Sequence, residues 1–203
     1  MRMWPVVTEE EERSVSVRSG ILALLTLGPA YGLQLHTELE TRTARAQGIN
    51  VGQIYSTLNR LTDAGLVVQV ARDAANQLPR YSLSAAGLAE ANSWIAGCGS
   101  GKPDWNEMVE HVLLVATLPG VDPEPLIADY NAAWGALQQS SGSDAHSAGD
   151  GVARASENAD QLLASVALGW LNDLRTSILG QDIQPHPLSS ERPRRGRRPH
   201  QMS

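Results

Sequence analysis

Two neighbouring stretches decide the fold: residues 48–67 read GINVGQIYSTLNRLTDAGLV, and residues 79–83 read PRYSL. Asn50 is a good helix N-cap, and Gly65 stands where a glycine commonly ends a helix. The apolar residues between them recur at helical spacing: Ile54, Leu58 and Leu61. The β-branched residues after Gly65 and the run PRYSL indicate two short strands joined by a turn. The sequence therefore predicts a helix followed directly by a small β-hairpin.

Further helices are predicted on both sides of this stretch. Apolar residues at helical spacing favour one helix over residues 17–25 and a second that starts near Tyr31. Ser84 can cap a further helix after the hairpin, and residues 97–103 break it. Helices followed by a hairpin are the order of a winged helix-turn-helix, in which one helix enters a DNA groove and the wing holds the backbone.

The second half of the chain is predicted to be helical, with apolar faces that are too wide for a lone helical hairpin and so need a partner surface. After residue 180 the chain is rich in Pro and Arg, which is typical of disorder. We therefore expect a mainly α fold with a small β-hairpin. Its predicted parts are an N-terminal extension (residues 1–13), a winged helix-turn-helix DNA-binding domain (14–97), a linker (98–103), a helical dimerisation domain (104–180) and a disordered basic tail (181–203).

The net charge of −6 at first argues against a nucleic-acid partner, but the charge is unevenly distributed. Residues 14–97 carry six Arg and five acidic residues, whereas residues 98–180 carry three basic and eleven acidic residues. The tail, residues 181–203, carries five Arg and two acidic residues. Because DNA is attracted by the charge on one face, whole-chain charge is a poor guide to binding. The tail is interpreted either as a solvated charge run or as a source of non-specific phosphate contacts.

On the predicted helix, the face opposite the apolar stripe carries polar side chains and no large apolar residue. Its amide, hydroxyl and guanidinium groups match base edges in the major groove, where Arg pairs with guanine and Asn or Gln with adenine. The candidates for base or backbone contact are Gln53, Ser56, Asn59 and Arg60. Arg72 and Arg80 flank the predicted wing tip and can reach phosphates. From these residues alone, a solvated polar face on a helix packed against a hairpin is an equally good interpretation.

Four blocks in order carry a resemblance to a known family: ILALL (residues 21–25), GPAYGLQL (28–35), GQIYSTLNRLTDAGLV (52–67) and PRYSLSAAG (79–87). Together they resemble the PadR family of bacterial transcriptional regulators, over residues 17–97. The helical second half, with Trp170 and Leu171 late in the chain, is similar to the dimerisation region of the smaller PadR-like proteins. The resemblance implies a homodimer that binds double-stranded operator DNA, usually as a repressor released by a small molecule.

The resemblance also implies a role for Tyr55, because the recognition-helix tyrosine of the family lies near the DNA backbone. The chain departs from the family pattern at Ser56, where Pro is common, and in a wing with fewer Lys, Arg and Gly. These departures leave the operator sequence and the wing contacts open. The alternative is a winged-helix module that holds a protein on the same face without specific DNA binding, since the second half is acidic and the wing is thinly charged.

Five Trp and no Phe make an unusual aromatic composition. One interpretation is packing in the core and at a dimer interface. The other is a flat aromatic effector stacked between Trp rings, which the resemblance supports because some PadR-like regulators bind planar drugs near such a Trp. Trp94 and Trp105, which bracket the linker, are the candidate effector-binding residues, whereas packing is favoured for Trp134 and Trp170.

Other kinds of site are not indicated. The run GSGK at residues 99–102 superficially resembles a phosphate loop, but Pro103 stands where a Ser or Thr would bind magnesium. The five His are scattered, without partners at ligand spacing, so we expect no metal, no cofactor and no catalytic residue. No apolar run approaches the roughly 18 residues of a membrane span, and the single Cys98 is compatible with a cytoplasmic location.

Overall fold

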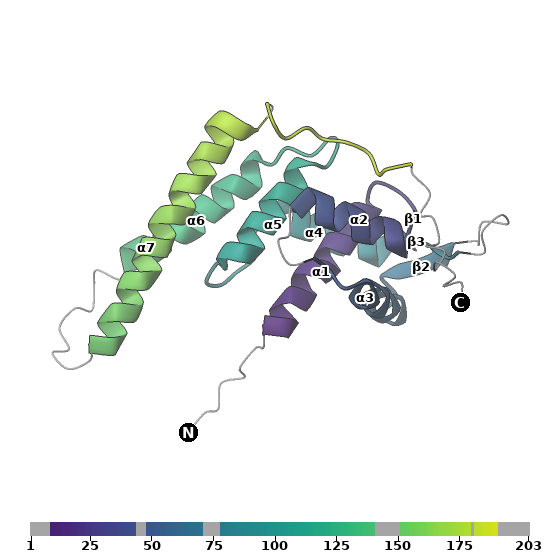
Figure 1. Ribbon diagram of the computed structural model, residues 1–203, viewed down its shortest axis with the longest axis horizontal. Helices are drawn as coiled ribbons and strands as arrows, with labels where there is room; N and C mark the ends of the chain where they lie inside the picture. The colour runs from purple at the N-terminus through teal and green to yellow at the C-terminus, as the bar shows by residue number, and fades with distance from the viewer. Residues whose placement is uncertain (1–8, 44–47, 71–77, 141–150, 180, 191–203) are drawn as a thin grey trace, which may run out of the picture.

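The computed structural model describes residues 9–43, 48–70, 78–140, 151–179 and 181–190 (Figure 1). Its elements are α1 (Glu9–Leu25), β1 (Ala30–Tyr31), α2 (Gly32–Thr43), α3 (Val51–Asp63), β2 (Val67–Val70), β3 (Arg80–Leu83), α4 (Ala85–Ala96), α5 (Trp105–Ala116), α6 (Glu124–Ser140), α7 (Gly151–Asp173) and a π-helical turn, η1 (Leu174–Ile178). The predicted mainly α fold with a small hairpin is confirmed. Among the described helices, none is both long and apolar enough to cross a membrane.

The boundaries of α3 and α4 follow from local sequence. The Asn50 side chain accepts a hydrogen bond from the Gly52 amide over 2.8 Å, as the predicted N-cap requires. Ser84 caps α4 in the same way, accepting from the Gly87 amide over 3.1 Å. Gly65 has a φ of +70°, in the left-handed region that favours glycine, and turns the chain from α3 into β2.

The sheet has three antiparallel strands in the order β1-β3-β2. Val67 lies opposite Leu83 and Val70 opposite Arg80, so β2 and β3 form the predicted hairpin. The two-residue β1 was not predicted, because the sequence pattern places Tyr31 in a helix. It adds to the free edge of β3, with Ala30 opposite Tyr81. This third strand connects the wing to the start of α2.

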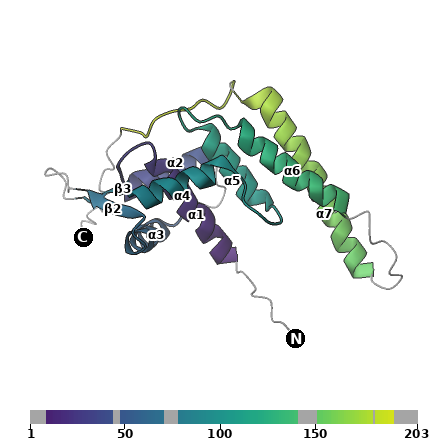
Figure 2. The ribbon, with the colours of Figure 1, turned by 180° about the vertical axis from the view of Figure 1, so that it is seen from behind.

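Two apolar cores lie side by side along the molecule. The first collects α1, α2, α3 and the sheet, with Ile21, Leu35 and Ile54 fully buried. The second lies among α5, α6 and α7, and Trp134 is buried there. Trp94, in α4, packs against both cores. In both ribbon views α6 and α7 run alongside each other and project away from α3 and the hairpin (Figures 1 and 2).

Residues 181–190 correct the prediction of a disordered tail that starts at residue 181. They cross the molecule from the end of α7 towards β1, passing over α2 (Figure 1). The physical reason is a buried arginine, because Arg42 of α2 donates hydrogen bonds to the carbonyls of His186 and Pro187 over 2.9 and 3.1 Å. Local composition does not reveal an anchor this far away in sequence. Residues 191–203 lie outside the described part of the chain, as do residues 1–8 of the predicted N-terminal extension.

Candidate nucleic-acid interface

The helix α3 separates an apolar face from a polar one. Its apolar stripe is buried in the first core: Ile54, Leu58 and Leu61. Thr57 is also buried, and its hydroxyl accepts a hydrogen bond from Arg60 Nη2 over 3.2 Å. Tyr55, Ser56, Asn59 and Arg60 are exposed, and Gln53 is half-buried. Nearly all of the residues predicted to touch bases therefore lie on one open face.

Two of these side chains are already partly engaged. The Ser56 hydroxyl donates to the Gln53 carbonyl over 3.0 Å, one helical turn back, which leaves its oxygen free to accept from outside. The hydrogen bond from Arg60 Nη2 to the Thr57 hydroxyl holds one end of the guanidinium group against α3. The guanidinium group of Arg60 has five N–H donors in a fixed fork, and the hydrogen bond to Thr57 uses one of them.

Tyr55 fixes how α3 sits on α2. A Cβ atom added to Gly32 would lie only 2.7 Å from Cε1 of the Tyr55 ring, so the ring occupies space that exists because residue 32 is a glycine. Tyr55 is nevertheless 39% exposed. Its ring therefore packs at the first turn of α2 and still borders the open face of α3.

Arg80, at the start of β3, contacts the neighbouring strand β1 and the residue before that strand. Arg80 Nη2 donates to the Pro29 carbonyl over 2.6 Å, and its guanidinium lies over the Tyr31 ring, 5.5 Å from the ring centre. Arg80 Nε is buried and has no hydrogen-bond partner within the described residues. Arg80 thus ties β3 to β1 and is half-buried, which leaves only part of its guanidinium available to a phosphate. Arg72, the other predicted wing contact, lies outside the described residues.

Trp94 stacks on a buried histidine where the two cores meet. The Trp94 and His111 rings are 3.7 Å apart between centres and nearly parallel, at 20°. His111 Nδ1 lies 3.0 Å from the Tyr130 hydroxyl. Burial lowers the pKa of His111 to about 3 and raises the pKa of Tyr130, so the imidazole is neutral at physiological pH.

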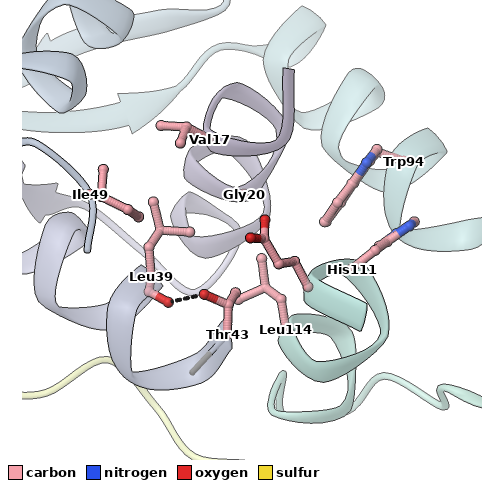
Figure 3. A pocket seen from close by; sticks show the side chains of 9 residues that line it. Val17, Gly20, Leu39, Thr43, Ile49, Trp94, His111 and Leu114 are labelled. Atoms are coloured by element: carbon pink, nitrogen blue, oxygen red, sulfur yellow. Dashed lines mark hydrogen bonds between the residues drawn. The ribbon is translucent and has the colours of Figure 1, made fainter. Parts of the chain in front are cut away.

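A small cavity adjoins this stacked pair (Figure 3). Its walls come from α1, α2, α4 and α5, and include Val17, Leu39, Trp94 and Leu114. It holds about 10 Å³, which is room for roughly one water molecule. The cavity therefore lies where the helices of the two halves of the molecule meet. An aromatic ligand does not fit in it unless the walls move.

Trp105 has a different ring partner from Trp94. It packs edge to face on Trp170 of α7, with ring centres 5.8 Å apart, and so contributes to the second core. Each of the two predicted effector residues is thus already paired with another ring. Among the described residues, no group of three His, Cys, Asp or Glu side chains is arranged to hold a metal ion.

Sequence reasoning missed several residues that hold the structure together behind this surface. Gly32 and Arg42 act through partners distant in the chain, and no local pattern marks them. His111 was considered only as a metal ligand. Its position within the apolar stripe of α5 was the available signal that it is buried.

The helix pair α2 and α3 with the hairpin β2–β3 defines a winged helix-turn-helix protein. Residues 21–93 match the model of the transcriptional regulator PadR-like family, which confirms the resemblance seen in the sequence.

Three solved structures of Bacillus subtilis PadR are similar to the chain, each with a TM-score of 0.37. One is a complex with operator DNA, with 20% identity over 80% of this chain and 97% of the other. A complex with p-coumaric acid shows 19% identity over 79% and 94%, and a third structure shows 18% over 86% and 96%. Among curated proteins, none matches the chain.

Proposed function

We propose that the protein is a homodimeric transcriptional repressor that binds operator DNA with α3 and the β2–β3 wing. The observation that carries this proposal is the open polar face of α3, held by its apolar stripe in the core and by Tyr55 against Gly32. A helix fixed in this way can enter the major groove as a rigid element. The match of residues 21–93 to the model of a family of transcriptional regulators supports the same function.

The contacts are expected to lie on the first three turns of α3, before Asp63. Arg60 and Asn59 carry groups that pair bidentately with guanine and adenine edges. Tyr55 and the N-terminal amides of α3 face phosphate, to which a helix N-terminus is attractive. Arg80 and Arg72 are proposed to contact phosphates from the wing. Asp63, exposed at the end of α3, repels phosphate and limits how deep the helix can lie.

Dimerisation is proposed to occur through α7. This helix exposes four large apolar side chains: Val152, Leu162, Leu163 and Val166. An apolar row on an isolated helix face is unfavourable in water and is buried well by a second copy of the same helix. A twofold dimer would place two α3 helices on half-sites about one DNA turn apart.

The substitution Arg60→Ala tests base reading. If Arg60 pairs with a guanine, the change weakens operator binding by about 1–3 kcal/mol and relaxes sequence preference at one position of each half-site. A binding assay over all single-base operator variants measures both effects. Arg154→Ala is the matched control, because this exposed arginine lies on α7 and should change nothing. Equal weakening on every sequence would reassign Arg60 to phosphate.

A protein-binding winged helix is the competing function. It is favoured by the acidic second half of the chain and by the engagement of Arg80 within the sheet. A gel shift at stated salt with the DNA upstream of its own gene separates the two. Absence of a sequence-dependent shift, together with a stable complex with another protein, would establish the competitor.

Release by a small aromatic effector is the last part of the proposal. Trp94 is the supported position, because it packs against both cores and stacks on His111. The adjoining cavity holds only about one water. A flat ligand would therefore have to displace Trp94 from His111, and this would loosen α4 from α5. Such a movement changes how the winged helix is held relative to the dimer helices.

Binding of such an effector should quench Trp94 fluorescence and weaken operator binding together. Titration of the wild type and the Trp94→Phe variant with planar aromatic acids measures both quantities. We expect the quench to be lost in Trp94→Phe, whereas Trp134→Phe should retain it, because Trp134 is buried in the second core. If no aromatic acid changes either emission or operator affinity in the wild type, the effector part of the proposal is wrong.

A further inference from the structure

After α7 the chain returns to the winged helix as a strap, residues 181–190, which passes over α2 (Figure 1). At its start Ile183 forms a β-bridge with Leu179, and both side chains pack against the second core. Near its end Leu188 packs against the first core. Leu188 follows Ile183 by five positions, and an extended chain of that length spans at most about 18 Å. The strap is therefore a short connection attached to both cores.

A buried arginine of α2 holds the middle of the strap. Arg42 is only 3% exposed, and its Nη2 donates to the carbonyls of His186 and Pro187 over 2.9 and 3.1 Å. Its Nη1 donates to the carbonyl and hydroxyl of Thr117, at the end of α5, over 2.9 and 3.1 Å. The His186 amide donates to the same Thr117 carbonyl over 3.1 Å. The helix α2, the end of α5 and the strap thus meet at one guanidinium group, whose burial is strongly unfavourable without its acceptors.

The last residues of the strap are bound along α2. Glu38 Oε2 accepts a hydrogen bond from Arg42 Nε over 2.7 Å, and Glu38 Oε1 accepts one from the Ser189 amide over 2.6 Å. Gln34 Nε2 donates to the Ser189 carbonyl over 2.6 Å. Gln34 and Glu38 lie four residues apart, on successive turns of α2. The strap is therefore fixed along one side of this helix.

The position of α2 determines the position of the proposed DNA-reading helix, α3. The Tyr55 ring of α3 packs where Gly32 opens space in the first turn of α2, and Leu35 and Ile54 are fully buried in the same core. The winged helix is connected to the α6–α7 pair through residues 97–104 and α5, before α6 begins. The strap adds a second connection, after α7 ends. Two connections restrict rotation of the α6–α7 pair against the winged helix.

We propose that the strap fixes the angle between the winged helix and α7, and thereby restricts the protein to operators with one separation of half-sites. This inference rests on the proposed DNA binding by a dimer that forms through α7, and it names the element that determines which operators are bound. In such a dimer the two α3 helices are joined through both copies of α7, so this angle sets their separation and rotation. One added base pair moves a half-site by about 3.4 Å and turns it by about 34°, and a rigid dimer matches one such arrangement.

A series of operators that differ in length between the half-sites measures this restriction. The operator is shortened or lengthened there by one and by two base pairs, and each affinity is measured at one salt concentration. The full chain should prefer one separation by about tenfold or more, because a rigid dimer must deform the DNA to use another. The strap variant combines Leu188→Asp with Ser189→Pro, which removes the apolar contact and the amide that binds Glu38. In this variant the preference should largely disappear.

The matched control combines Leu188→Met with Ser190→Pro. It keeps an apolar residue at position 188 and moves the proline to an exposed serine whose amide has no hydrogen-bond partner among the described residues. This control should keep the preference of the full chain. A strap variant that loses affinity equally at every separation, and so keeps the preference, would overturn the proposal. Absence of sequence-specific binding by the full chain at every separation would instead refute the proposed DNA binding.

A distance measurement on the free protein tests the strap without DNA. Spin labels are attached at Asp63→Cys in α3 and Glu157→Cys in α7, both exposed, in a Cys98→Ser background. Dilution with unlabelled protein restricts the signal in pulsed electron paramagnetic resonance to pairs within one protomer. The full chain and the control should give one narrow distribution of distances, and the strap variant a broad one. Equal distributions in all three would overturn the proposal, whether or not an operator is bound.

Circular dichroism establishes that the strap variant is folded before either experiment. If it does not fold, Ser189→Pro alone takes its place in both, because that change removes a single hydrogen bond. The expected direction is the same, a weaker preference for one separation and a broader distribution of distances. An unchanged preference and an unchanged distribution in this folded variant would overturn the proposal.

Discussion

Replacing Arg42 with alanine is expected to lower the free energy of unfolding by about 3–5 kcal/mol, the cost of breaking a buried ion pair by removing one partner. Arg42 is 3% exposed, and its guanidinium donates to five acceptors on Glu38, on Thr117 and on the carbonyls of His186 and Pro187. Its removal leaves the Glu38 carboxylate buried without its cation and leaves the carbonyls of His186 and Pro187 without this donor, whereas the Thr117 carbonyl keeps its bond from the His186 amide. Denaturant unfolding followed by circular dichroism measures the loss.

The matched control is Arg18→Ala. Arg18 also forms an ion pair, with Glu90 of α4, but both side chains are 38% exposed. An exposed pair contributes about 0–1 kcal/mol, so the control variant should unfold close to the wild type. An equal decrease in the free energy of unfolding for the two variants would contradict this prediction. The contacts of Arg42 with His186 and Pro187 would then contribute nothing to stability.

Introducing Leu162→Glu and Val166→Glu together is expected to convert the proposed dimer into a monomer. These side chains are 62% and 57% exposed on α7, so the charges cost the folded protomer little. At a dimer interface the same charges would be buried without partners, which is strongly unfavourable. Operator affinity should fall by about 10²–10⁴-fold, because the two half-sites are no longer bound by one linked pair of α3 helices.

Molar mass from light scattering, together with a gel shift, measures this second prediction. Leu88→Glu is the control, since Leu88 is an exposed leucine on α4 and lies away from α7. It should leave both molar mass and operator affinity unchanged. A double variant that remains dimeric would place the dimer interface elsewhere. A wild-type protein that is monomeric at micromolar concentration would remove α7 from the proposal.

The sequence predicted those features that depend on neighbours in the chain. The caps at Asn50 and Ser84, the stripe of α3 and the pairing of β2 with β3 are local patterns, and all appear in the structure. The resemblance to the PadR-like family also came from blocks of local sequence, and the family match over residues 21–93 confirms it.

The remaining features depend on contacts between distant residues. Residues 181–190 lack an apolar pattern and were predicted to be disordered, but Arg42 and Glu38 bind their backbone from α2. The prediction that Arg80 contacts phosphate at the wing tip did not include β1. In the structure the Arg80 guanidinium donates to the carbonyl of Pro29, just before this strand, and lies over the ring of Tyr31. Periodicity carries no information on such pairings, which are set by tertiary packing.

The central proposal is that the open face of α3 reads DNA, and footprinting on the region upstream of the gene tests it most directly. At a stated salt concentration we predict two protected half-sites about one DNA turn apart, with protection lost when Asn59→Ala and Arg60→Ala are combined. Arg154→Ala should preserve the footprint. A footprint that survives the loss of both α3 side chains, or no protection by the wild type at any upstream sequence, would contradict the proposal.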